Sequence, residues 1–169
     1  QGFGSDGEPN PWYYEMPEPG FNYRASDIHC ALGLSQLAKL GRFVAERRRV
    51  AEWYEDELAP PAPLAIPLSR VPWSEPAWHL NVVLIDFRAL GVSRASVMRA
   101  LAAKGIGSQV HYLPVHRQPY YRRLYGEMNL PGADAYYERA LSLPLYVGLA
   151  RADVARVVAA LAEALGLKP

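Results

Sequence analysis

The segment that most constrains the fold of this chain is an apolar stretch at residues 77–87. Side chains of a strand alternate between two faces, and both faces of this stretch are mostly apolar. One face holds Leu80, Val82 and Leu84, and the other holds Asn81, Val83, Ile85 and Phe87. Because both faces need cover, the sequence predicts the central strand of a sheet. We interpret His79, near the start of the stretch, as a structural residue.

Further helices and strands alternate along the rest of the chain. Apolar residues recur at helical spacing in some segments and alternate in others. Strands are predicted at 64–67, 106–112 and 141–146, and helices at 93–104, 119–125, 133–141 and 154–165. The cleanest helical face holds Val154, Val157, Val158, Leu161 and Leu165. This order predicts an α+β domain, a small sheet with helices packed on it.

Residues 20–58 are predicted to form a polar loop followed by two helices or one bent helix. Ser26 or Asp27 is a suitable N-cap for the first helix. The apolar residues of that helix fit no single stripe, so we expect it to be covered on more than one side. Gly41 marks the expected break between the helices.

The predicted organisation has three parts. They are a loop at 1–25, linking helices at 26–58 and the small α+β domain at 59–169. A chain of 169 residues can bury a substantial core. Because it opens at Gln1 without Met, we expect it to be a truncated piece of a longer protein.

Composition argues against several functional classes. The chain has 18 basic and 17 acidic residues, so no net charge attracts it to nucleic acid or a membrane surface. It has no apolar run of about 18 residues, so we expect no membrane span. The single cysteine, Cys30, allows no internal disulfide and fits a reducing, cytoplasmic location. We expect this thiol to be inert inside its apolar helix.

Three separated motifs resemble a known family. The first runs from Gly20 through Asn22 and Arg24 to Gln36-Leu37, the second is Pro11-Trp12-Tyr13-Tyr14-Glu15-Met16, and the third is the segment 109–121. Together they resemble the DegT/StrS sugar aminotransferases, which are enzymes of fold type I that depend on pyridoxal 5'-phosphate. The second and third motifs are similar to the branch that acts in pseudaminic acid biosynthesis. The resemblance covers about residues 11–165.

This resemblance implies a fold, an activity and partners. The fold is the C-terminal small domain of a fold type I enzyme, preceded by linking helices. The activity is transfer of an amino group, from glutamate, to the 4-keto carbon of a UDP-linked 6-deoxy sugar. The enzyme is expected to be a cytoplasmic homodimer that binds neither nucleic acid nor a membrane.

The family also needs a lysine that holds pyridoxal phosphate as a Schiff base. The lysines of this chain are Lys39, Lys104 and Lys168, and none lies in the family's Ser-x-x-Lys context. We therefore predict no catalytic residue here, a large cofactor-binding domain upstream, and no activity for this chain alone.

Two loop residues are implied to bind the cofactor. By the resemblance, Asn22 reaches across a dimer interface to the phosphate of the partner's pyridoxal phosphate. The alternative is that Asn22 caps the following helix. Arg24 is implied to hold a phosphate or the carboxylate of the amino donor, because its guanidinium suits both. The alternative for Arg24 is an interface ion pair.

A second group of residues is implied to line the substrate. His111, Tyr112 and His116 are expected to form a wall near the sugar or nucleotide, with both imidazoles facing one cleft. Tyr13 is expected to contact the sugar or the nucleobase, or to fill the dimer interface. We predict no metal site, because the two histidines lack a third ligand nearby.

Two other classes remain open for the chain as a whole. The first is a non-catalytic dimerisation or binding module that retains the small-domain fold. The second is an RNA-binding module using Arg122 and Arg123, and the near-neutral charge argues against it.

Overall fold

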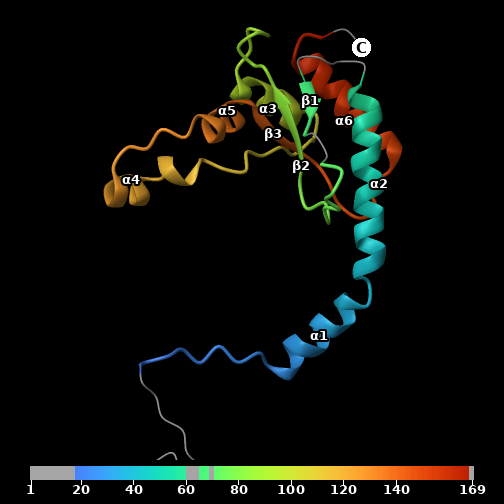
Figure 1. Cartoon of the computed structure of the whole chain (residues 1–169). Coiled ribbons are helices and arrows are strands. Elements are labelled where there is room, and N and C mark those ends of the chain that lie inside the picture. Colours follow the sequence, from blue (N-terminus) through green and yellow to red (C-terminus); the bar gives the residue numbers. More distant parts are fainter. Residues whose placement is uncertain (1–17, 60–64, 69–70, 168–169) are drawn as a thin grey trace, which may run out of the picture. The chain divides into compact units, whose positions relative to one another are not determined.

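The computed structural model describes residues 18–59, 65–68 and 71–167 (Figure 1). These residues fall into two compact units, one ending at Ala38 and the other beginning at Lys39. The first unit contains α1 (Asp27–Leu37). The second contains α2 (Leu40–Leu58), β1 (Ala65–Pro67), β2 (Asn81–Ile85), α3 (Arg94–Ala103), the short 3-10 helix η1 (Val115–Arg117), α4 (Pro119–Tyr125), α5 (Pro131–Arg139), β3 (Ala140–Leu143) and α6 (Arg151–Ala164).

The sheet of the second unit has the strand order β1-β2-β3, and both pairings are antiparallel. Ile85 of β2 lies opposite Ala65, and Asn81 lies opposite Leu143. The prediction of a central strand within 77–87 is therefore confirmed. Val83 and Ile85 are fully buried, as expected of a strand that is covered rather than exposed at an edge.

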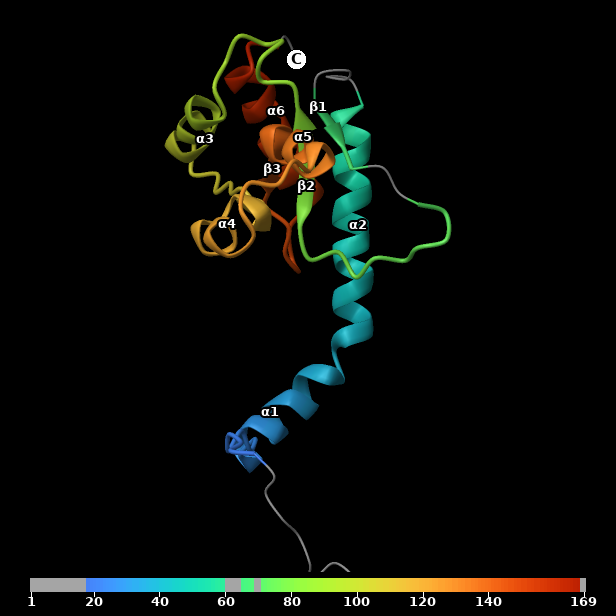
Figure 2. The ribbon, with the colours of Figure 1, turned by 60° about the vertical axis from the view of Figure 1, so that its left-hand side comes forward.

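Helices α2, α3 and α6 contribute to one hydrophobic core with the sheet. Figure 2 shows α2 beside both α6 and β1, and these pairs are in contact. The whole predicted face of α6 is buried there: Val154, Val157, Val158, Leu161 and Leu165. Each fully buried aliphatic side chain contributes about 1.5–3 kcal/mol of transfer free energy. The expected α+β architecture is confirmed, because helices α2, α3 and α6 pack their apolar faces on a small sheet.

One predicted strand is wrong. Residues 106–112 form no strand and make only an isolated bridge, between Gln109 and Ser142. Gly105 has φ +70° and turns the chain back at the end of α3, where Ile106 N donates to Leu101 O. Ile106 packs into the core instead of pairing with a strand. Gln109 alone in this segment pairs with the sheet.

For α1, the expected N-cap is confirmed and the expected position of the helix break is wrong. Ser26 is the N-cap, and its Oγ accepts a hydrogen bond from His29 N. The break lies at Ala38 and Lys39 rather than at Gly41, which is helical within α2. No residue of α1 is buried, and Cys30 is exposed. The described part of this chain therefore does not cover the apolar side chains of α1, and the expected burial of the thiol within it is not seen.

Tyr54 gives a testable pH dependence. Its ring is completely buried, and its hydroxyl donates to Pro144 O at 2.8 Å. Burial, followed by the nearby Tyr146 and Asp153, raises the pKa of Tyr54 well above its usual range. The unfolded chain ionises this hydroxyl near pH 10, whereas the folded chain does not. The contribution of Tyr54 to the free energy of unfolding is therefore fully present below pH 10 and falls by about 1.4 kcal/mol per pH unit above it.

A Tyr54→Phe variant tests this dependence. We expect it to lose about 1 kcal/mol at pH 8, because the hydrogen bond to Pro144 is gone. Above pH 10 its stability should fall less steeply than that of the wild type, which urea denaturation at pH 8 and pH 11 measures. Equal losses in both proteins would show that Tyr54 is not the group responsible.

Candidate functional site

The loop before α1 presents Asn22 and Arg24 at the surface. Both line a hollow with Glu18, Gly20, Phe21 and Tyr23. The rings of Phe21 and Tyr23 stack with centroids 5.3 Å apart, so they stiffen the loop between them. Because Ser26 caps α1, the alternative role of Asn22 as the helix cap is excluded. Its amide makes no hydrogen bond to any described residue, which leaves it available to a ligand.

The described lysines have ordinary structural positions. Lys39 is exposed at the start of α2. Lys104 is the C-cap residue of α3, and its Nζ pairs with the Glu163 carboxylate. Lys168 lies outside the described residues.

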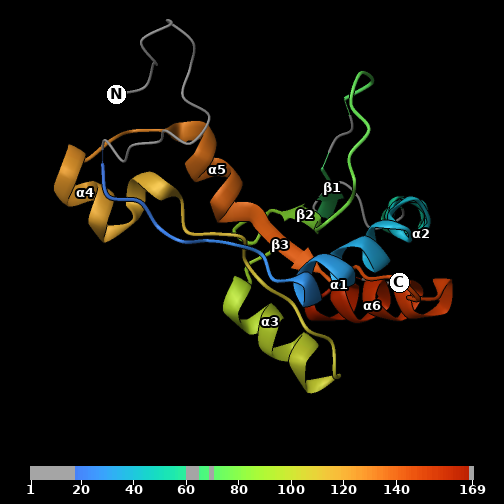
Figure 3. The same ribbon diagram turned by 90° about the horizontal axis from the view of Figure 1, so that it is seen from below.

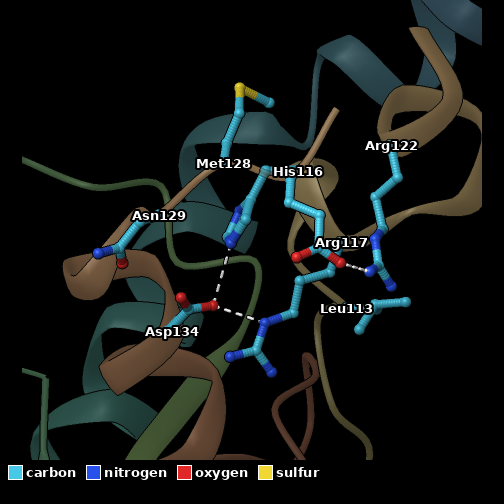
Figure 4. A pocket seen from close by; sticks show the side chains of 8 residues that line it. Leu113, His116, Arg117, Arg122, Met128, Asn129 and Asp134 are labelled. Carbon is cyan, nitrogen blue, oxygen red and sulfur yellow. Dashed lines mark hydrogen bonds and ion pairs between the residues drawn. The ribbon is translucent and has the colours of Figure 1, made fainter. Parts of the chain in front are cut away.

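In the second unit, His116 and Arg117 both contact the carboxylate of Asp134. The His116 side chain, on η1, is almost fully buried, and Nε2 lies 3.1 Å from Asp134 Oδ1 (Figure 4). Arg117 Nε lies 2.6 Å from the same oxygen. These residues line a hollow of about 590 Å³, which also includes Leu113, Arg122, Glu127, Met128 and Asn129. The His116 imidazole is thus engaged with α5 rather than free to meet a ligand through Nε2.

Helix α5 is held from two further directions. Arg94 of α3 lies over the Tyr137 ring at 4.7 Å and donates to Ala140 O. Arg117 lies over the same ring at 5.7 Å. Figure 3 shows α5 running directly into β3, so these contacts also determine where β3 begins.

His111 lies at a different hollow. Its Nδ1 is 2.7 Å from Ser142 Oγ, and the exposed Tyr112 ring meets the imidazole edge-on at 4.7 Å. The hollow has a volume of about 330 Å³, and its lining residues are His79, Leu80, Gly107, Ser108, Gln109, His111, Ser142, Leu143, Pro144 and Leu145. The structure therefore separates His111 and His116, which we expected to face one cleft.

Two lining residues were missed by the sequence analysis. His79, interpreted as structural, is exposed and lines the same hollow as His111. Ser142 is a buried polar residue between two buried leucines of β3. A lone serine in an apolar strand is a signal that a side-chain partner exists, although the sequence does not say which one.

The remaining predictions concern absences or undescribed residues. Tyr13 and its neighbours Trp12 and Tyr14 lie outside the described residues. Across residues 18–59, 65–68 and 71–167 there is no group of three or more His, Cys, Asp or Glu side chains that could hold a metal ion. None of the helices in these ranges is both long and apolar enough to cross a membrane.

Comparison with known proteins gives one family and a set of solved structures. Residues 1–162 match the DegT/DnrJ/EryC1/StrS aminotransferase family. Helicobacter pylori PseC, an aminotransferase involved in the biosynthesis of pseudoaminic acid, is 25% identical, with a TM-score of 0.81 over 94% of this chain and 42% of its own.

Two other solved structures are similar. A putative sugar aminotransferase of Streptococcus pneumoniae, Spr1654 in its PMP form, is 27% identical, with a TM-score of 0.80 over 92% of this chain and 39% of its own. DesV of S. venezuelae, in complex with a ketimine intermediate, is 28% identical, with a TM-score of 0.76 over 95% of this chain and 42% of its own. The chain spans about two fifths of the length of these solved structures.

Proposed function

Because this chain belongs to the DegT/DnrJ/EryC1/StrS aminotransferase family, we propose that it is the C-terminal part of a pyridoxal-phosphate-dependent nucleotide-sugar aminotransferase. The whole enzyme transfers an amino group from glutamate to the 4-keto carbon of a UDP-linked 6-deoxy sugar, in the cytoplasm. The observation that carries this proposal is the match over residues 1–162. The similarity to PseC supports placing the enzyme in the branch of the family that acts in pseudaminic acid biosynthesis.

The loop at Asn22 fits the phosphate end of the cofactor. A phosphate offers only acceptor oxygens at its ionised positions, and both the Asn22 amide and the Arg24 guanidinium donate hydrogen bonds. Both line the same surface hollow. The cofactor, when bound, supplies an electron sink for the carbon that exchanges the amino group. On this proposal Asn22 and Arg24 orient that cofactor by its phosphate, in the partner subunit of a homodimer.

The covalent attachment of the cofactor lies elsewhere in the enzyme. Attachment requires an unprotonated amine beside the cofactor, whereas Lys104 is held as an ion pair with Glu163. We propose that the Schiff-base lysine is outside these 169 residues and that this chain alone is inactive. The exposed apolar side chains of α1, such as Ile28 and Leu34, support an interface with the rest of the enzyme or its partner.

We propose that His111 and Tyr112 form the substrate-side wall. Tyr112 is 70% exposed, and its hydroxyl is free to reach a ligand beside the hollow at His111. Tyr13 remains a proposed contact to the sugar or the nucleobase. His116 remains a proposed substrate contact at a separate hollow, where its Nε2 is already paired with Asp134.

Cofactor trapping tests the proposal. The full-length enzyme and this chain are each mixed with pyridoxal phosphate, reduced with borohydride and mapped by peptide. We expect one stoichiometric lysine adduct in the full-length enzyme, outside residues 1–169, which prior incubation with glutamate prevents. This chain should show only sparse labelling of Lys39, Lys104 and Lys168.

Two other outcomes have clear meanings. A single glutamate-sensitive adduct within residues 1–169 contradicts the assignment of the lysine to another part of the enzyme. The absence of any specific adduct in the full-length enzyme favours the second candidate function, a dimerisation or binding module that retains the fold.

A further inference from the structure

Ser142 joins the loop that carries His111 to the sheet through three hydrogen bonds. Ser142 N donates to Gln109 O at 2.8 Å, and Gln109 N donates to Ser142 O at 3.2 Å. The third bond joins Ser142 Oγ and His111 Nδ1 at 2.7 Å. Ser142 is only 6% exposed, and a buried hydroxyl without a hydrogen-bond partner would destabilise the folded chain.

The three bonds have separate roles. The two backbone bonds, and the pairing of Ser142 with Val82 of β2, hold the strand and the loop together whatever the side chain is. The hydroxyl is needed only for the imidazole. A change of Ser142 to alanine therefore removes one interaction with His111 while keeping the backbone in place.

The contact with the hydroxyl also bears on which nitrogen of the neutral ring carries the proton. A neutral imidazole has one donor nitrogen and one acceptor nitrogen, and the partner of one nitrogen selects which is which. We assign the Ser142 hydroxyl as the donor to Nδ1, so that His111 carries its proton on Nε2 and offers an N–H donor to a ligand. Tyr112 meets the ring edge-on and restricts its rotation.

The lining of the hollow indicates a neutral polar ligand. None of the described residues that line it is Asp, Glu, Lys or Arg, and its polar groups are imidazoles, hydroxyls and an amide. A phosphate would leave its charge without a cationic partner here. The hydroxyl and amide groups of a sugar match these side chains, and Leu80 and Leu145 offer apolar surface to the ring carbons.

We propose that Ser142 is a positioning residue that holds the His111 imidazole as an Nε2–H donor toward the sugar of the substrate, with His79 as a second contact on the same hollow. This inference rests on the proposed function, and it names two residues of that function's substrate site. Ser142 itself acts through His111 and need not touch the sugar.

The tautomer of His111 is the first test. In the 15N-histidine-labelled chain, long-range 1H–15N spectra should show the neutral wild-type His111 ring as the Nε2–H tautomer, and a mixture of the two tautomers in Ser142→Ala. Ser93→Ala is the matched control, because it also loses a serine hydrogen bond, that to Ser96 N at 3.0 Å, but its residue does not line the hollow. A wild-type ring protonated on Nδ1, or a pattern unchanged by Ser142→Ala, overturns the proposal.

Kinetics of the full-length enzyme give the second test. Ser142→Ala should raise KM for the nucleotide sugar about five- to tenfold and lower kcat less than twofold. In a His111→Ala background the same change should have no further effect, because Ser142 acts through His111. The Ser93→Ala control should leave KM unchanged. If Ser142→Ala raised KM by the same factor in the His111→Ala background as in the wild type, Ser142 would have a merely structural role and the proposal would be overturned.

Failure of this inference and of the proposed function can be distinguished. A wild-type enzyme that aminates no nucleotide sugar overturns both. An active wild-type enzyme with an unchanged KM in Ser142→Ala overturns the role of Ser142 alone. His79→Ala should raise the same KM without altering the His111 tautomer, and an unchanged KM would remove His79 from the site.

Discussion

Replacing Asn22 by aspartate in the full-length enzyme is expected to weaken its affinity for pyridoxal phosphate by about 10- to 100-fold. Aspartate has the same shape as asparagine, but it removes an N–H donor and places a negative charge beside a phosphate. A hydrogen bond to a charged group is worth about 1.5–3 kcal/mol, which corresponds to this range. Titration of the apoenzyme with the cofactor, followed by absorbance, measures the effect.

Controls on the same loop separate binding from loop structure. Asn22→Asp should leave α1 intact, because Ser26 caps that helix. Tyr23→Phe keeps the ring that stacks on Phe21 and should leave the affinity unchanged. Arg24→Ala should also weaken binding if the guanidinium holds the phosphate. Equal affinity in the wild type and Asn22→Asp would exclude Asn22 from the cofactor site.

Replacing Asp134 by alanine is expected to destabilise the packing of η1 on α5 by about 2–3 kcal/mol. One carboxylate oxygen accepts from both Arg117 Nε and the buried His116 imidazole. Its removal leaves the almost fully buried imidazole without its partner and frees Arg117. Denaturant unfolding and hydrogen exchange over residues 113–139 measure the loss, and exchange should rise first in η1 and α5.

Matched changes show whether the carboxylate is responsible. Asp134→Asn keeps an acceptor oxygen for one partner, so we expect about half the loss of the alanine variant. Glu138→Ala removes an exposed carboxylate from the same helix and should cost less than about 0.5 kcal/mol. If Asp134→Ala matches Glu138→Ala, the Asp134 carboxylate does not stabilise this region.

Much of the fold was predictable because its signals are local. The buried face of α6, the N-cap Ser26 and the central strand β2 each follow from residues close together in the sequence. The strand predicted at 106–112 failed for the opposite reason. Its alternation looked extended, but the turn at Gly105 and the packing of Ile106 directed the chain away from the sheet.

For the candidate site, too, local features could be predicted and contacts between distant residues could not. Its motif residues Asn22, Arg24, His111 and His116 could be named from their sequence context, whereas their surroundings could not. His116 and Asp134 are 18 residues apart, and His111 and Ser142 are 31 residues apart. No local pattern links such pairs, because hydrogen bonds of single side chains leave no periodic signal.

The sequence by itself determined most of the helices and strands, the α+β class and the family, since these depend on periodicity and on short motifs. Only the tertiary structure decided that His111 faces one hollow with His79 and Ser142, and that His116 is held by Asp134 at another. The physical reason is that antiparallel pairing of β2 with β3, and the docking of α5 beside η1, bring together groups that the chain keeps far apart.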